Sequence, residues 1–385
     1  MGGGDPAAVA VGQPAMTEPA AAVTPTRSEG RYWTVRLLRP DEDAVMADLS
    51  RACFGTRGDS LEFIRARYTH STGPRVSVVV GDAGGQICGT QAVTFFPGFA
   101  AGREITIGMF TAGMTHPDHR KRGVFRDVVL SAERYAWEQG ADCLFTMPND
   151  ESFPSFQRFP GWRCLADRPL LAMPLRLGRL LGDRGMPRWL SGPVGFLSDG
   201  ALARRFSTPP ATVIELGDLA PLVSAFDQLA EQEGRRSGRI ICRRDSAFLR
   251  WRFLQNPSFK YRVFVARNSD SIEGYLVTTI EHRMKTTLAH VVDWLAIPAP
   301  GALEGLIAAG ARAAREDGAT LIAMIATSGA RVEPFRAFGF HRVPRRLVGR
   351  GFHTAVAINP ARSDLAELGS GDDGWHLTLG DFDTI

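Results

Sequence analysis

Apolar residues recur along the chain with two alternating periods, one typical of strands and one of helices. They form strand-like runs at Glu104–Thr115 and Cys143–Met147. Between these runs, Phe125–Ala136 repeats its apolar residues every three or four positions, which predicts a helix with one face against a sheet. Strands that alternate with helices predict an α/β fold whose mixed sheet is partly parallel.

The same patterns extend towards the N-terminus. Tyr32–Leu38 alternates as an opening strand. A helix is predicted after Asp41 up to about Phe54, and a second one at Ser60–Thr69, because each follows residues that cap helices. Glycines between two strand-like runs within Val76–Phe96 predict a turn, and hence a hairpin, before the strand at Glu104.

The pattern returns in the second part of the chain. A helix is predicted at Ala302–Glu316 and a strand at Ala319–Ala326, after three strand-like runs between Tyr261 and Ile297. The spacing from Gly140 to Gly161 is 21 residues, and so is the spacing from Gly318 to Gly339. Equal spacing with the same order of elements indicates an internal repeat.

This repeat and the chain length predict two domains with flanking segments. The Ala/Pro/Gly-rich leader is predicted to be disordered, and six prolines between residues 163 and 215 predict an irregular connector. The tail from Trp375 alternates like a last strand. The predicted divisions are a leader at 1–30, an N-terminal domain at 31–175, a connector at 176–215, a C-terminal domain at 216–360 and a tail or strand at 361–385.

Composition narrows the classes of function. The net charge of +4 is small for 385 residues, which argues against a nucleic-acid partner, and the basic, aromatic segment Arg243–Phe253 fits a packed helix better. Five cysteines without a paired spacing predict buried thiols in a reducing cytoplasm and no metal site. No apolar run has membrane-spanning length, so no membrane partner is expected.

The loop Arg120–Phe125 carries the strongest chemical signal. It lies between an apolar strand and an amphipathic helix, so its backbone N–H groups open that helix. A helix N-terminus attracts anions, Gly123 permits close approach of a ligand, and three cations precede it. The pattern indicates a phosphate site, with a basic helix start that holds no ligand as the alternative.

This loop resembles the acyl-CoA pyrophosphate loop of the GCN5-related N-acetyltransferases (GNAT). The shared pattern is R-x-x-G after a strand ending in Thr115-His116-Pro117, although Phe125 replaces the family's usual Gly or Ala. The stretch Asn149…Ser152…Phe156…Gly161-Trp162 is similar to the family's next motif. Motif matches are confined to residues 112–162, whereas the order of elements agrees over about residues 32–350.

The resemblance implies two GNAT-like domains in tandem, in a layout similar to the Eis-type (enhanced intracellular survival) acetyltransferases. In the second copy, Pro298-Ala299-Pro300 stands where the first has Arg120-Lys121-Arg122. Prolines lack N–H donors, so the second domain is expected to lack the CoA pyrophosphate loop.

The co-substrate implied by the resemblance is acetyl-CoA or another acyl-CoA, without a metal. In the family, backbone groups at an irregularity in the strand before the loop, here near Gly113, hold the thioester carbonyl. The two predicted helices before the hairpin would border the acceptor site. The residues expected to bind the cofactor are Met114, Thr115, Arg120, Lys121, Arg122, Gly123, Val124, Phe125 and Asn149.

Catalytic residues are less well defined by the pattern. The family's usual acid is a Tyr where this chain has Phe156, so Ser152, Ser155 or a water would serve instead, or the thiolate would leave unaided. Glu104 and Asp150 are candidate bases at strand ends, with a solvated surface role as the alternative. By similarity to the Eis-type enzymes, the C-terminal carboxylate of Ile385 is a further candidate.

The resulting hypothesis is an acyl-CoA-dependent N-acyltransferase. It would transfer the acyl group directly, in a ternary complex, to a primary amine of a small molecule such as an amino sugar or an antibiotic. The alternative is a non-catalytic acyl-CoA-binding or regulatory protein, which the Phe at position 156 favours. The acceptor, the acyl chain length and the oligomeric state stay open, and oligomer formation remains possible.

Overall fold

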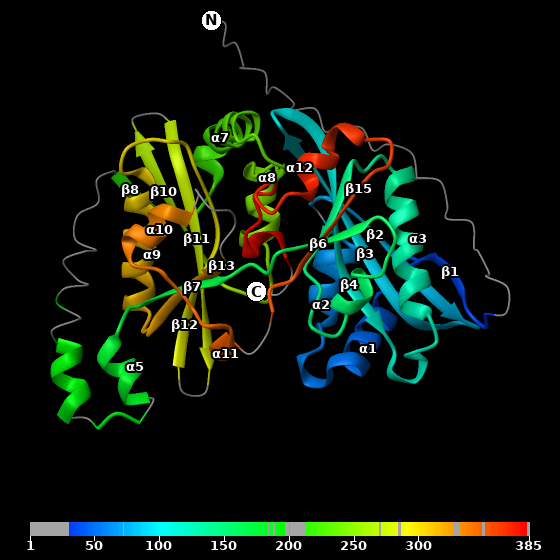
Figure 1. The fold of residues 1–385 in the computed structure, drawn as a ribbon, viewed down its shortest axis with the longest axis horizontal. Helices are drawn as coiled ribbons and strands as arrows, with labels where there is room; N and C mark the ends of the chain where they lie inside the picture. The colour runs from blue at the N-terminus through cyan, green and yellow to red at the C-terminus, as the bar shows by residue number, and fades with distance from the viewer. Residues whose placement is uncertain are drawn as a thin grey trace, which may run out of the picture.

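The computed structural model describes residues 31–382, apart from residues 72, 184, 188, 197–199, 201–211, 269–270, 284–285, 326–331 and 349–350. The predicted leader and residues 383–385 therefore lie outside the described residues, as does part of the predicted connector. The chain forms two mixed sheets that lie side by side, with the C-terminal segment between them (Figure 1).

The first sheet is built mainly from the N-terminal part of the chain. Its strands, in spatial order, are β1 (Thr34–Leu37), β2 (Arg75–Ala83), β3 (Gln86–Ala100), β4 (Arg103–Thr115), β5 (Cys143–Thr146), β15 (Thr354–Ile358) and β6 (Trp162–Leu165), and β9 (Ile241–Cys242) pairs with β3. The β4–β5 pair is parallel, and the other pairs along this order are antiparallel. A mixed sheet of this kind agrees with the predicted α/β class.

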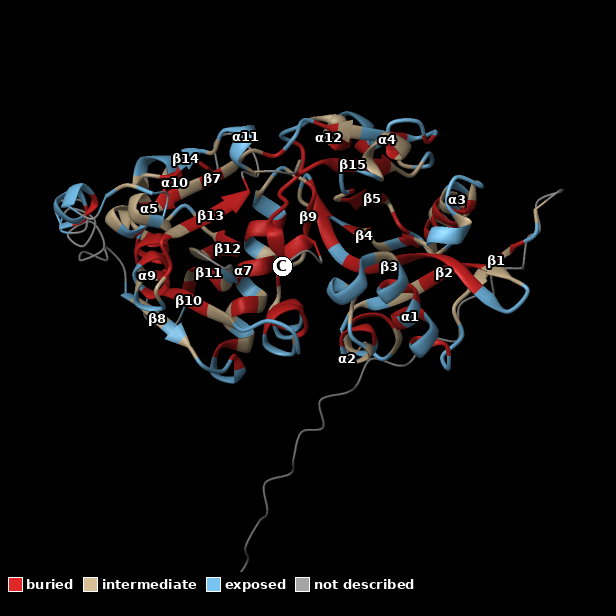
Figure 2. Ribbon diagram, turned by 90° about the horizontal axis from the view of Figure 1, so that it is seen from below, coloured by how far each residue is buried: buried red, intermediate tan, exposed pale blue. Residues whose placement is uncertain are grey.

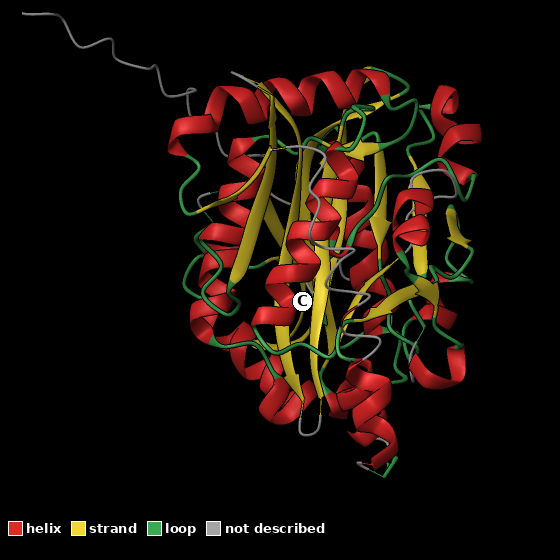
Figure 3. Ribbon diagram, turned by 90° about the vertical axis from the view of Figure 1, so that its left-hand side faces the viewer, coloured by secondary structure: helices red, strands yellow, loops and turns green. Residues whose placement is uncertain are grey.

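The second sheet has a closely similar construction. Its strands, in spatial order, are β14 (His341–Arg342), β7 (Leu170–Pro174), β13 (Leu321–Ile325), β12 (Thr286–Ala296), β11 (Ser271–Arg283), β10 (Tyr261–Asn268) and β8 (Thr212–Leu216). Here the β12–β13 pair is parallel, as β4–β5 is in the first sheet. Figure 3 shows helices lying over the outer face of this sheet.

The helices connect these strands. They are α1 (Asp43–Phe54), α2 (Leu61–Ile64), α3 (Val124–Glu138), α4 (Phe153–Phe156), α5 (Leu177–Asp183), α7 (Val223–Arg236), α8 (Ser246–Leu249), α9 (Ala302–Glu316), α10 (Glu333–Phe338), α11 (Arg345–Val348) and α12 (Ala366–Ser370). Helices α2 and α8 each continue as a π-helical turn, at Arg65–Thr69 and Arg250–Leu254. No helix among the described residues is long and apolar enough to cross a membrane.

The internal repeat is visible in the backbone. Gly123 and Gly301 begin α3 and α9 with left-handed φ angles of 96° and 79°, and each helix has 15 residues. Gly161 and Gly339 also have positive φ, at 79° and 113°. Positive φ strains other residues, so these glycines fix equivalent turns in the two halves.

The two sheets exchange one strand each. Strand β7 follows β6 in sequence but pairs with β13 and β14 in the second sheet. Strand β15 comes from the C-terminal part and pairs between β5 and β6 in the first sheet. The contiguous ranges 31–175 and 216–360 do not follow this exchange, because the local pattern of a short strand does not specify its partner.

The tail is the clearest departure from the sequence-based expectation. A last strand was expected from Trp375 on, but in the described part of the tail the ladder pairing is limited to one bridge between Ile240 and Trp375, followed by a 3₁₀ turn at Leu379–Asp381. The alternation failed as a guide because the polar positions are buried as well as the apolar ones. The tail lies in the apolar core between the sheets, where Figure 2 shows buried residues.

Candidate functional site

The site begins where β4 and β5 part. Their parallel pairing ends at Phe110 and Thr146, while β4 continues to Thr115. On its other side, the β3–β4 register shifts between Thr90 and Ala92. The shift leaves Ala112 and Gly113 opposite Gln91, so the irregularity includes Gly113, near which the sequence predicted it. The strain falls on Ala112, which has a φ of 49°. The strand therefore bends away and leaves an opening beside residues 111–115.

Gln91 holds this bulge in place. Its Nε2 donates to the carbonyl oxygens of Thr111 at 2.8 Å and Ala92 at 3.0 Å. A Cβ added to Gly113 would lie 2.9 Å from Gln91 Oε1 and 3.3 Å from the ring of Phe125. Gly113 is thus required for close packing. Sequence reasoning missed Gln91, although an amide in the middle of the apolar run Ile87–Phe96 was a usable signal.

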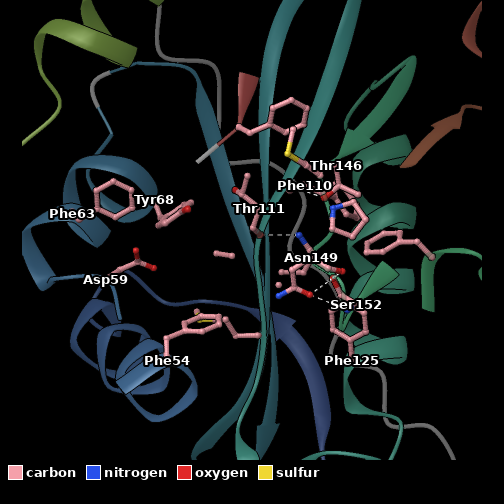
Figure 4. A pocket seen from close by; sticks show the side chains of 18 residues that line it. Phe54, Asp59, Phe63, Tyr68, Phe110, Thr111, Phe125, Thr146, Asn149 and Ser152 are labelled. Carbon is pink, nitrogen blue, oxygen red and sulfur yellow. Dashed lines mark hydrogen bonds between the residues drawn. The ribbon is translucent and has the colours of Figure 1, made fainter. Parts of the chain in front are cut away.

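Three adjoining cavities form a channel through this opening. The first, of about 240 Å³, lies between the β4–β5 opening and residues 43–69, here called the α1–α2 segment, which run from α1 to the π-helical turn after α2 (Figure 4). The second, of about 180 Å³, shares Gly113, Asn149 and Ser152 with it. The third, of about 630 Å³, shares Thr115 and Arg120 with the second and reaches the N-terminus of α3.

The third cavity is strongly cationic. Four arginines and lysines line it against one acid, Glu151; the cations are Arg120, Lys121, Arg126 and Arg158. The first turn of α3 adds backbone N–H groups that lack a partner within the helix. Arg31 Nη1 donates to the carbonyl oxygen of Arg122 at 2.7 Å and so steadies the loop. This end of the channel suits phosphate groups.

The middle of the channel suits a polar chain. The hydroxyl oxygens of Thr111 and Thr115 are buried and have no hydrogen-bond partner among the described residues, although both residues line the channel. Unpaired buried hydroxyls are unfavourable, and a ligand with amide groups would satisfy them once the threonine side chains rotate towards the channel. Cys53 Sγ lies 3.3 Å from the Thr115 carbonyl oxygen, and burial raises the pKa of this thiol. Phosphate, amide and apolar regions in this order match acyl-CoA.

Most of the residues predicted to bind the cofactor lie along the channel. Those that line at least one cavity are Met114, Thr115, Arg120, Lys121, Gly123, Val124, Phe125 and Asn149. Arg122 is not among the described lining residues; its Nη1 lies 3.5 Å from the hydroxyl of Tyr32. Phe125 borders all three cavities and packs on Phe156, with ring centroids 6.1 Å apart.

Two predicted bases are placed away from the channel. Glu104 begins the far end of β4, where its carboxylate lies 3.0 Å from Arg235 Nη2. Asp150 accepts from the backbone N–H of Gly351 at 3.2 Å and lies 2.7 Å from His353 Nε2. The His353 hydrogen bond lowers the pKa of Asp150. Neither residue is among the described lining residues, because each carboxylate is engaged by a partner elsewhere.

Ser152 and Asn149 do border the channel. The Ser152 hydroxyl donates to Asn149 Oδ1 at 2.9 Å, and this oxygen also accepts from the Ser152 backbone N–H at 2.9 Å. Phe156 is buried against Trp162, so no O–H group stands at that position. Ile385 lies outside the described residues. Among the described residues, no group of three His, Cys, Asp or Glu side chains could hold a metal ion.

The second half of the chain contributes to the first cavity. Phe382 lines it, and the carbonyl oxygen of Phe382 accepts from Arg252 Nη2 at 2.5 Å. The next residue back, Asp381, pairs with the buried Arg244. Two further lining residues, Asp59 and Tyr68, come from the α1–α2 segment. Sequence reasoning missed all three because their approach depends on tertiary structure.

Comparisons with known proteins also find similarity to acetyltransferases. A family model described as an acetyltransferase (GNAT) domain matches residues 34–164. No curated protein matches the sequence at a significant level. Among solved structures, a GCN5-related N-acetyltransferase from Anabaena variabilis has a TM-score of 0.60 and 10% identity over 86% of this chain and 73% of its own.

Two further structures are similar over both sheets. A probable N-acyltransferase of unknown function from Enterococcus faecalis has a TM-score of 0.59 and 12% identity over 84% of this chain and 72% of its own. N-myristoyltransferase from Saccharomyces cerevisiae, solved with myristoyl-CoA, has a TM-score of 0.58 and 10% identity over 90% of this chain and 87% of its own. At such identities the likeness shows the fold alone.

Proposed function

Because residues 34–164 form a domain of the GNAT acetyltransferase family, we propose that this chain transfers an acyl group from acyl-CoA to a primary amine of a small molecule. Acetyl-CoA is the first donor to test. The continuous channel, from the cationic third cavity to the β4–β5 opening, carries the proposal. A channel with charge at one end and aromatic walls at the other suits a long donor that presents its acyl end to a second substrate.

In this proposal, different residues along the channel bind different parts of acyl-CoA. Arg120, Lys121 and the first turn of α3 bind the phosphates. Thr111 and Thr115 offer hydroxyls to the amide-bearing arm, and the bulge held by Gln91 orients the reacting end. Both substrates are bound together, so the amine attacks directly. Proximity and orientation supply much of the acceleration in such a complex.

The second half is proposed not to bind CoA. Pro298 and Pro300 have no N–H, and the N–H of Ala302 donates to the Ala299 carbonyl oxygen at 3.2 Å. The loop before α9 therefore offers few free donors and no cation. Its proposed role is to anchor the tail that completes the first cavity.

A second candidate function is that of a non-catalytic acyl-CoA-binding protein. Phe156 favours it, because a phenyl ring cannot give a proton to the leaving thiolate. Under the first proposal the thiolate leaves unaided or takes a proton from Ser152 or water. The two functions differ in a single observable, the release of free CoA thiol when an amine is present.

Kinetics of thiol release, followed with a thiol-reactive dye, test both. Acetyl-CoA and longer acyl-CoAs are offered with a panel of primary amines. Lys121→Ala is expected to raise the KM for acyl-CoA about tenfold, because it removes a charged contact to phosphate. Lys260→Ala removes an exposed lysine from the other half and should change nothing. CoA binding without release would favour the second candidate, and absence of CoA binding by calorimetry would refute both.

A further inference from the structure

The side of the first cavity formed by the α1–α2 segment has its own chemistry. Phe54, Asp59, Phe63 and Tyr68 from the α1–α2 segment line it, facing the β4–β5 opening (Figure 4). Phe63 and Tyr68 are buried and meet edge to face, with ring centroids 6.3 Å apart. Phe54 is 42% exposed and stands at the mouth. Three aromatic residues and one carboxylate therefore line this side of the cavity.

The carboxylate of Asp59 is held at the cavity wall by Ser50. Ser50 Oγ donates to Asp59 Oδ2 at 3.1 Å and accepts from the Asp59 backbone N–H at 2.9 Å. This pair of bonds fixes the connection between α1 and α2 and with it the position of the acid. Asp59 carries the single formal charge among the described residues that line this cavity.

We infer that Asp59, Phe54, Phe63 and Tyr68 form the subsite for the acceptor's ammonium group, and that the acceptor is a monocationic primary amine with an apolar body. The inference rests on the proposed function and narrows its substrate class. A carboxylate and aromatic faces both attract a cation, and they do so more strongly in a partly dehydrated pocket.

The other residues that line the first cavity indicate how polar the rest of the acceptor molecule can be. Phe110, Met147, Phe156 and Phe382 present apolar side chains to the same cavity, and the polar residues beside them, such as Gln91 and Asn149, carry no charge that could pair with a second ammonium group. A polyamine or an aminoglycoside would place further ammonium groups against these side chains or towards the cationic third cavity. Unpaired charges in such surroundings are strongly unfavourable. The cavity therefore favours an arylalkyl or alkyl amine over the polycationic amino sugars considered from the sequence.

The chemical step assigns Asp59 a binding role. The amine nitrogen forms a bond to the acyl carbon as the carbon–sulfur bond breaks. Starting from the ammonium form, one proton ends on the CoA thiol and one passes to solvent, so the products are the amide and free CoA. Because Asp59 holds the ammonium before this step, its loss should raise the KM for the amine while leaving the KM for acyl-CoA unchanged.

The test uses acetyl-CoA with 2-phenylethylamine, hexylamine, spermidine and kanamycin. The two monoamines are expected to be the better acceptors of the wild-type protein. Asp59→Asn keeps an oxygen that can accept from Ser50 and should raise the KM for 2-phenylethylamine by about 10- to 100-fold. Asp48→Asn is the matched control, because it removes an exposed carboxylate of the preceding helix, α1, that pairs with Arg51.

Two further measurements keep the inference separate from the proposed function. Phe54→Leu retains bulk but removes the ring, and it should raise the monoamine KM by about threefold. Calorimetry with 2-phenylethylamine and CoA reads the subsite without turnover, so binding lost in Asp59→Asn supports the subsite even where no thiol is released. Thiol release that prefers spermidine or kanamycin, or an Asp59→Asn variant with unchanged monoamine affinity, would overturn the inference alone.

Discussion

The two halves of the molecule contain the same opening but use it differently. In the first half, β4–β5 pairing ends at Phe110 and Thr146, and a cavity follows. In the second half, β12–β13 pairing ends at His290 and Ala323, and β12 also carries a register shift. Beyond that point the tail packs against β12, since Thr378 Oγ1 donates to Asp293 Oδ1 at 2.7 Å.

This difference shows that the shared backbone does not by itself make a site. Helices α3 and α9 begin at equivalent glycines with nearly the same angles. What differs is the chemistry around them, namely three cations before one glycine and two prolines before the other. The second opening is also filled by the chain itself. A duplicated fold has thus separated into a half with a channel and a half that holds the tail.

The largest expected effect concerns the buried charges around Asp293, which hold the tail in the second half. Arg244, Asp293 and Asp381 are fully buried, with Arg244 Nε 3.0 Å from Asp293 Oδ1. Arg244→Met leaves two buried carboxylates without their cation, which should lower the free energy of unfolding by about 3–5 kcal/mol in urea titrations. Burial raises the pKa of Asp381, so the folded variant should take up protons and its deficit should shrink at lower pH.

Arg243→Met provides the matched control for this network. Arg243 is the neighbouring residue, but its side chain is 31% exposed and lies 3.2 Å from Glu231. Surface pairs of this kind contribute under about 1 kcal/mol. Equal losses in the two variants would show that the tail is not held by the buried charges.

The paired glycines give the next largest effect. Gly123→Val and Gly301→Val both place a side chain at positive φ, so each should lose about 1–3 kcal/mol of stability. Only Gly123→Val should also weaken CoA binding, by about 100-fold, because its side chain would meet the guanidinium of Arg31 and disturb the phosphate loop. Calorimetry with CoA measures the difference, and similar losses of affinity in both would remove the proposed asymmetry.

A smaller effect is expected on the rate at which cysteines are alkylated, which tests whether CoA occupies the channel. Cys53 lines the second cavity, whereas Cys164 lies on β6 and is not among the described lining residues. Saturating CoA should slow alkylation of Cys53 by about tenfold or more, by mass action, and leave Cys164 unaffected. Burial raises the pKa of both thiols, so labelling should accelerate as pH rises through and above 9. Peptide mass spectrometry separates the two sites, and equal protection would argue against a channel at Cys53.

The sequence predicted those features that depend on local pattern. The bounds Ala302–Glu316 of α9 agree with the prediction, because a glycine start and an amphipathic period are both local. The basic loop before α3 could be recognised for the same reason, and its binding of phosphate stays a prediction. The exchange of β7 and β15, the buried tail and the approach of Asp59 to the opening depend on pairing between distant segments. Nothing in a five-residue strand specifies its partner, and a buried polar residue such as Asp293 looks like any surface carboxylate in the sequence.

The strand exchange also has a consequence for the order of synthesis. Strand β5 ends at Thr146 and its neighbour β15 begins at Thr354, about 200 residues later. At the usual rate of translation, of 5–20 residues per second, the first sheet waits roughly 10–40 s on the ribosome with an open edge at β5. Buried apolar residues such as Phe145 are uncovered during that interval. The half that carries the channel is made first and completed last.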